Sequence, residues 1–74
     1  MRVVPKANPT AADIAEAEAD YNTGVDAQRR GAPKSAQRFF VDALSKGLSG
    51  TKGQDAQRRI KQIVDRTTLE ASEF

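Results

Sequence analysis

The sequence predicts an all-α protein with an extended N-terminal arm followed by three helices. Apolar residues recur at three- and four-residue spacing in the later stretches of the chain, as expected for helices that bury one face. Gly31 and Gly47 stand where two of the helical patterns end, and Pro5, Pro9 and Pro33 all lie before or at a helix start. The predicted organisation is an arm at 1–9, a three-helix domain at 10–70 and a C-terminal tail at 71–74.

The first helix is expected to follow Thr10 and to end at Gly31. Thr10 is a suitable N-cap, and Asp13 three residues later makes an approximate capping box. Acidic residues gather in the first half of the stretch, and Arg29 and Arg30 close it. This charge order complements the helix dipole, which favours negative charge near the N-terminus and positive charge near the C-terminus.

The second helix is expected from about Pro33 to Lys46. Proline suits the first turn of a helix, because the N–H group that it lacks has no partner there. Gly47 should end the helix, with Leu48 supplying the apolar contact of a Schellman-type stop. The residues of its apolar stripe are Ala36, Phe39, Phe40, Ala43 and Leu44.

The third helix is expected from about Gln54 to Leu69, after a loop with the sequence "SGTKG". Asp55 then lies in its first turn. The connections between the three helices are short, which favours antiparallel neighbours. The expected inner face of this helix consists of Ala56, Ile60, Ile63, Val64 and Thr67.

Composition excludes several classes of function. The chain has 74 residues and contains neither cysteine nor histidine, so the usual zinc sites and the usual nucleophile–base pairs cannot form. We expect no catalytic residue, no metal, no cofactor and no enzymatic activity. No apolar run approaches the roughly 20 residues that cross a bilayer, and "MRVVPKANP" lacks the apolar region of a secretion signal. A cytoplasmic protein without membrane insertion is therefore expected.

The stretch from Ala17 to Leu44 resembles one tetratricopeptide repeat. The resemblance implies an antiparallel helical hairpin in which Gly24 and Ala36 let the two backbones approach and Phe40 fills the space beside them. The third helix resembles the first half of a next repeat and would act as a capping helix. A weaker similarity is to three-helix domains of the microtubule-interacting-and-transport type. The matching residues are Ala19, Tyr21, Gly24, Ala27, Gly31, Ala36, Phe40, Ala43 and Leu44.

The resemblance also implies where a partner protein would bind, because partners in that family often dock on the face lined by first helices. An alternative, which we favour for Tyr21 and Val25, is that they pack against the third helix. Phe39 adjoins Phe40 and cannot share its narrow stripe, so it lies either at the edge of the core or near the surface as a contact anchor. The candidate partner-binding residues are Glu18, Tyr21, Val25, Gln28, Arg29 and Phe39.

The pentapeptide "DAQRR" occurs twice, at 26–30 and 55–59. The copies fall late in the first helix and early in the third, so they are not equivalent positions of a duplicated unit. Their arginines belong to a candidate basic patch, which we interpret as a solvated or protein-contacting surface rather than a phosphate-binding one. Acidic residues alternate with the basic ones, and the net charge is only +2. The patch comprises Arg29, Arg30, Lys34, Arg38, Arg58 and Arg59.

These observations favour a non-enzymatic protein–protein interaction module, acting as a small subunit or adaptor in a larger assembly. Four aromatic residues in 74 predict a thin core, so the domain should gain stability from a protein partner or from copies of itself. The alternative is a small nucleic-acid-associated protein that uses its Arg and Lys clusters.

Overall fold

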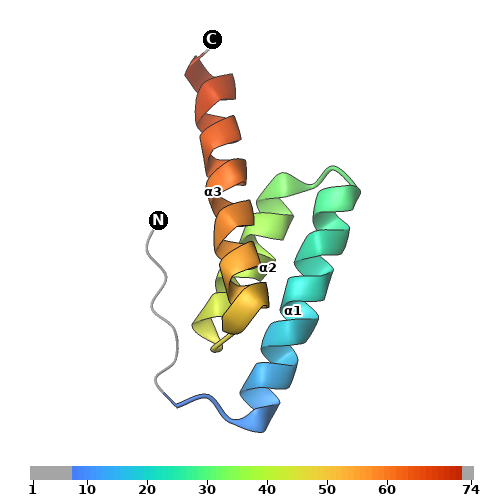
Figure 1. Ribbon diagram of the computed structural model, residues 1–74. Helices are drawn as coiled ribbons and strands as arrows, with labels where there is room; N and C mark the ends of the chain where they lie inside the picture. The colour runs from blue at the N-terminus through green and yellow to red at the C-terminus, as the bar shows by residue number, and fades with distance from the viewer. Residues whose placement is uncertain (1–7, 73–74) are drawn as a thin grey trace.

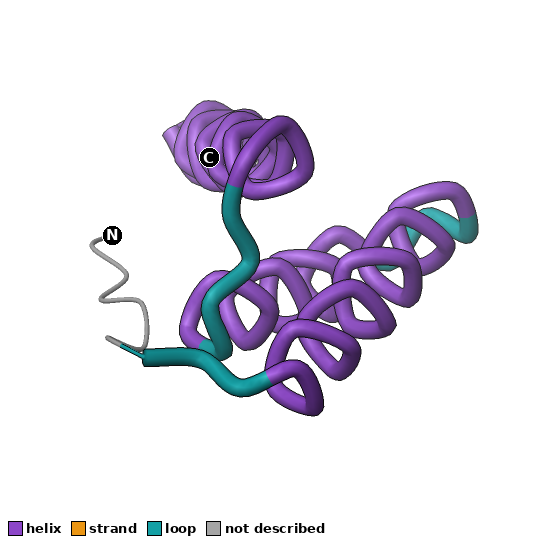
Figure 2. Tube along the Cα trace, turned by 60° about the horizontal axis from the view of Figure 1, so that its bottom comes forward, coloured by secondary structure: helices purple, strands orange, loops and turns teal. Residues whose placement is uncertain are grey.

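A computed structural model describes residues 8–72, which form three helices and confirm the all-α prediction. The helices are α1 (Ala11–Arg29), α2 (Pro33–Ser45) and α3 (Gly50–Ser72). Helices α1 and α2 lie side by side and run in opposite directions, and α3 turns back along α2 (Figure 1). Seen from another side, α3 lies on one face of the pair formed by α1 and α2 (Figure 2). The main helix contacts are therefore α1 with α2 and α2 with α3.

The predicted start and end of α1 are confirmed. The Asp13 N–H donates to Thr10 Oγ1 at 3.1 Å, and the Thr10 N–H donates to Asp13 Oδ2 at 2.9 Å, which completes the capping box. Gly31 has φ +79 at the turn into α2. That left-handed conformation is easy for glycine and costly for residues with a Cβ, so glycine is required here by backbone geometry alone.

The predicted stop of α2 is also confirmed. Gly47 has φ +109, the Leu48 N–H donates to the Ala43 carbonyl at 3.0 Å, and the Leu48 side chain is buried. The Pro9 ring lies so close to Gly47 that a Cβ on that glycine would come within 2.7 Å of Pro9 Cβ. The last residue of the predicted arm is thus packed on the α2–α3 turn. Residues 1–7 of the arm lie outside the described part.

Helix α3 is longer than predicted at both ends. It begins at Gly50, so most of the segment expected as a loop is its first turn. Gly53 is buried within that turn, and a Cβ there would stand 2.9 Å from the Leu48 carbonyl oxygen. Close packing against the preceding turn thus accounts for a glycine inside the helix. Residues 71–72 of the predicted tail are helical, and 73–74 lie outside the described part.

The core lies where α2 faces its two neighbours. Phe40 is fully buried, and its ring covers Gly24 of α1 so closely that a Cβ on Gly24 would lie 2.6 Å from Phe40 Cε1. The missing side chain of Gly24 thus leaves the space that the Phe40 ring occupies. The buried apolar residues are Ala17, Ala36, Phe40, Ala43, Leu44, Leu48, Ala56, Ile60 and Ile63.

A polar contact joins α1 to the residue that follows α2. Lys46 Nζ donates to Asp20 Oδ2 at 2.7 Å and lies 3.5 Å from Glu16 Oε2. The hydrogen bond to Asp20 raises the pKa of Lys46 above its usual value. Asp20 therefore occupies the helix interface as an ion-paired residue, where an apolar side chain would otherwise be expected.

Candidate functional site

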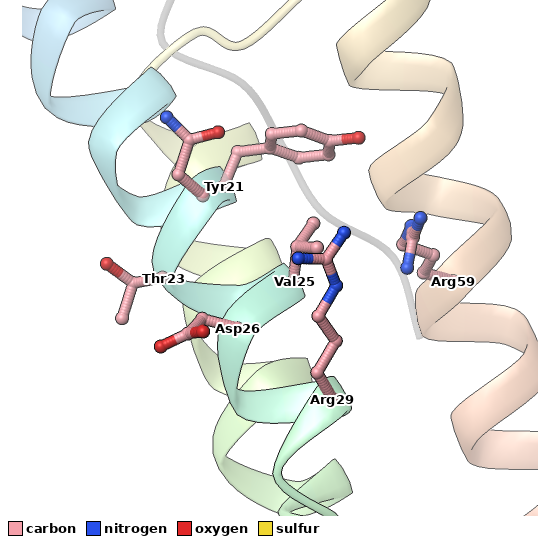
Figure 3. A pocket seen from close by; sticks show the side chains of 7 residues that line it. Tyr21, Thr23, Val25, Asp26, Arg29 and Arg59 are labelled. Carbon is pink, nitrogen blue, oxygen red and sulfur yellow. The ribbon is translucent and has the colours of Figure 1, made fainter.

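Between α1 and α3 the surface is hollowed into a depression with walls from both helices (Figure 3). Two further depressions continue it, one toward the start of α3 and one toward the α1–α2 turn. We call the three together the α1–α3 groove. The central depression is lined by Tyr21, Asn22, Thr23, Val25, Asp26 and Arg29 of α1 and by Arg59 of α3.

Four side chains cross the groove and tie α1 to α3; we call them the α1–α3 bridge. The Tyr21 hydroxyl donates to Asp55 Oδ2, which also accepts from Arg59 Nε at 2.7 Å. Arg59 Nη1 donates in turn to Gln28 Oε1 at 2.8 Å. Arg58 adds a contact from the same helix, with Nη2 at 2.5 Å from Asp55 Oδ1. The bridge therefore joins residues more than thirty positions apart through one carboxylate and one guanidinium.

The electrostatics of the bridge fix its protonation state. Hydrogen bonds from Tyr21, then from Arg58 and Arg59, hold the pKa of Asp55 well below its ordinary value. The hydrogen bond to Asp55, with some contribution from burial, raises the pKa of Tyr21 above 10.0. Near neutral pH Asp55 is ionised and Tyr21 is protonated, so the phenol is a donor and not a nucleophile. The ionised carboxylate and the phenol thereby hold α1 and α3 together.

Both DAQRR copies contribute residues to the bridge, but their ion pairs differ in exposure. In the first copy Asp26 pairs with Arg30 at 2.8 Å, with side chains 55% and 77% exposed. In the second copy Asp55 pairs with Arg59 at 2.7 Å, with side chains 15% and 32% exposed. Gln28 of the first copy accepts a hydrogen bond from Arg59 of the second. The same local ion pair is thus a surface contact in α1 and a helix-joining contact in α3.

The structure brings five of the six candidate partner-binding residues to the groove or its rim. Tyr21 and Gln28 belong to the bridge, and Val25 and Arg29 line the central depression. Glu18 lies at the rim, 3.9 Å from Lys52 Nζ of α3.

Tyr21 contacts both α2 and α3. Its ring packs on Phe40 with centroids 5.9 Å apart, and its hydroxyl reaches α3. Val25 is half-buried against the core cluster and lines the groove with its remaining surface. The same side chains therefore line the groove and make contacts between helices.

Phe39 is not brought to the groove. It is not among the residues that line the three depressions. Its side chain is half-buried. Phe39 therefore does not join the other five residues at the groove.

The basic patch is divided among several surfaces. Arg58 and Arg59 both pair with Asp55, and Arg30 pairs with Asp26. Arg59, expected on a solvated or protein-contacting face, is instead half-buried and joins the two helices. Arg29 lines the groove, and Lys34 and Arg38 are exposed on α2.

Sequence reasoning missed Asp55 and Lys52 as members of the site. Asp55 could have been suspected, since Arg58 and Arg59 follow it at the spacing of helical ion pairs. Lys52 fell in the segment expected as a loop, so its position beside Glu18 left no sequence signal.

Comparisons of the chain with protein-family models, with curated proteins and with solved structures found no match. Among residues 8–72, no cluster of carboxylates is arranged to hold a metal ion. Within the same residues, no helix has both the length and the apolar content that crossing a membrane requires.

Proposed function

We propose that this chain is a non-enzymatic protein–protein interaction module, and that its partner binds in the α1–α3 groove. In this proposal α1 and α2 form one tetratricopeptide-like hairpin, and α3 is its capping helix. The observation that carries the proposal is the groove itself. Helices α1 and α3 meet mainly through the polar bridge, so side chains of both helices remain available along its length.

The thin core supports a role as a small cytoplasmic subunit or adaptor. Phe40 is the only large side chain with essentially no exposed surface among the described residues. A domain of this size with a core so rich in alanine gains stability when a partner binds its folded state. A second protein, or a second copy of this chain, would supply that stabilisation.

The distribution of the basic residues over several surfaces favours a protein partner over nucleic acid. Phosphate backbones are bound by a patch or stripe of basic residues on one face. Here Arg30, Arg58 and Arg59 each contact a carboxylate of the chain, so acidic groups interrupt the basic ones.

Site-specific photocrosslinking in the source cells tests the proposal. A photoreactive residue replaces Asn22 in the groove, and a matched control replaces Lys61 on the exposed side of α3. We expect one discrete protein adduct from position 22, lost when Val25→Arg is added, and no such adduct from position 61. Adducts that disappear on nuclease treatment, or equal adducts from both positions, would contradict the proposal.

A further inference from the structure

The residues that line the α1–α3 groove carry an excess of positive charge, unlike the rest of the chain. Its three depressions are lined by five cations and two carboxylates. The whole sequence carries only +2, so the net positive charge is concentrated in the groove. The two carboxylates, Asp26 and Asp55, are already paired within their own helices. The cations are Arg29, Lys52, Arg58, Arg59 and Arg66.

Three of these cations follow a heptad spacing along α3. Lys52, Arg59 and Arg66 are seven residues apart. Arg59 lines the central depression and shares a second one with Lys52, and Arg66 lines the third. Seven residues of α-helix rise about 10.5 Å and return to nearly the same side. The α3 wall of the groove therefore presents a row of positive charges at that interval.

Arg29 stands on the opposite wall, in the central depression (Figure 3). It makes no ion pair with a described residue, whereas its neighbour Arg30 is held by Asp26. Arg59 uses Nε and Nη1 in the bridge and leaves Nη2 without a partner among the described residues. Both guanidinium groups can donate to a further carboxylate without breaking the bridge.

The geometry points to an acidic helix of a partner protein as the occupant of the groove. This inference rests on the proposed function and adds the chemistry of the partner. A helix aligned with α3 repeats its side chains every 10.5 Å or so, so carboxylates at heptad spacing face Lys52, Arg59 and Arg66 in turn. An extended segment repeats same-side residues every ~6.6 Å and does not match the row. Apolar residues beside those carboxylates would contact Tyr21 and Val25.

Binding of synthetic peptides to the full chain tests the inference. One helical peptide carries glutamates at every seventh position, and an isomer of identical composition carries them at every fifth. Fluorescence anisotropy at low salt should show tighter binding of the heptad peptide. The groove variant Lys52→Gln/Arg66→Gln should weaken that binding about fivefold, since exposed ion pairs contribute modestly. The variant Lys34→Gln/Lys61→Gln removes the same charge elsewhere and should change it less than about twofold.

Each other outcome overturns the inference. Equal binding of the two peptides, or equal weakening by the two double variants, would show only diffuse charge attraction. If a single-stranded oligonucleotide bound more tightly than the heptad peptide, and this binding depended on Lys52 and Arg66, the row of cations would be a phosphate-binding site instead. Absence of peptide binding, with a protein adduct still formed from position 22, would reject the acidic helix and leave the proposed function standing. Circular dichroism of both double variants verifies that they are folded.

Discussion

Helix α1 meets its two neighbours through different chemistry. Against α2 it presents Gly24, whose missing side chain lets the Phe40 ring sit directly on the backbone. Against α3 it presents Tyr21 and Gln28, whose polar ends reach Asp55 and Arg59. The first contact is apolar and closely packed, and the second is a narrow set of hydrogen bonds that crosses the α1–α3 groove.

This difference indicates which contact determines the fold and which determines the shape of the groove. Packing of buried apolar groups leaves little tolerance for added volume, because protein interiors are as dense as organic crystals. A hydrogen-bonded bridge between partly exposed side chains contributes less, and water can replace part of it. Substitutions on the side of α1 that faces α2 should therefore lower the stability more than substitutions on the side that faces α3.

The largest effect is expected from Gly24→Leu. Even a Cβ at this position would lie within 3 Å of two Phe40 ring atoms, and Phe40 is fully buried. The free energy of unfolding should fall by about 1–3 kcal/mol or more, measured by urea denaturation followed by circular dichroism. Asn22→Leu on the exposed side of the same helix is the control and should change it little. Equal stability of the two variants would contradict the close contact between Gly24 and Phe40.

The next largest effect is expected from Asp55→Ala, with Asp26→Ala as its matched control in the same pentapeptide. Asp55→Ala removes the acceptor of Tyr21, Arg58 and Arg59 and should cost about 1–3 kcal/mol of unfolding free energy. Asp26→Ala breaks one exposed pair and should cost about 0.5 kcal/mol or less. If chemical denaturation gave the same loss for both, the bridge would be no more than a surface ion pair.

A smaller effect is expected from Tyr21→Phe, which keeps the ring on Phe40 and removes only the hydroxyl. Asp55 keeps its two arginine partners, so the loss should be about 0.5–1.5 kcal/mol. A double-mutant cycle with Asp55→Ala isolates the contact. A coupling energy of zero between the two substitutions would show that the hydroxyl does not join α1 to α3.

The ends of the helices were predictable because they depend on local chemistry. Thr10 and Asp13 bond to each other's backbone, and Gly31 and Gly47 adopt positive φ where the sequence placed the turns. The start of α3 was not predictable in this way. Gly50 and Gly53 have low helix propensity, and the fit of Gly53 against the Leu48 carbonyl appears only in three dimensions.

The site was predictable only on its α1 wall. Tyr21, Val25, Gln28 and Arg29 share one side of a helix, which the residue spacing already indicates. Their partner Asp55 lies 34 residues beyond Tyr21, and the contact depends on how α3 is rotated on α2. Helical periodicity does not fix that rotation. The sequence therefore supplied the candidate wall of the groove but not the bridge across it.

The smallest effect on the bridge is expected from mild acid. The folded-state pKa of Asp55 is depressed, so its contribution is fully present above the ordinary pKa of an aspartate and is lost as the pH falls toward the folded-state value. Between about pH 4.5 and about pH 3.5 the unfolded chain binds a proton at this residue while the folded chain does not, so stability should fall. Urea denaturation across this range should show a shallower fall for Asp55→Asn than for the native sequence. Identical slopes for the native sequence and Asp55→Asn would show that Tyr21 and the two arginines do not stabilise the ionised carboxylate.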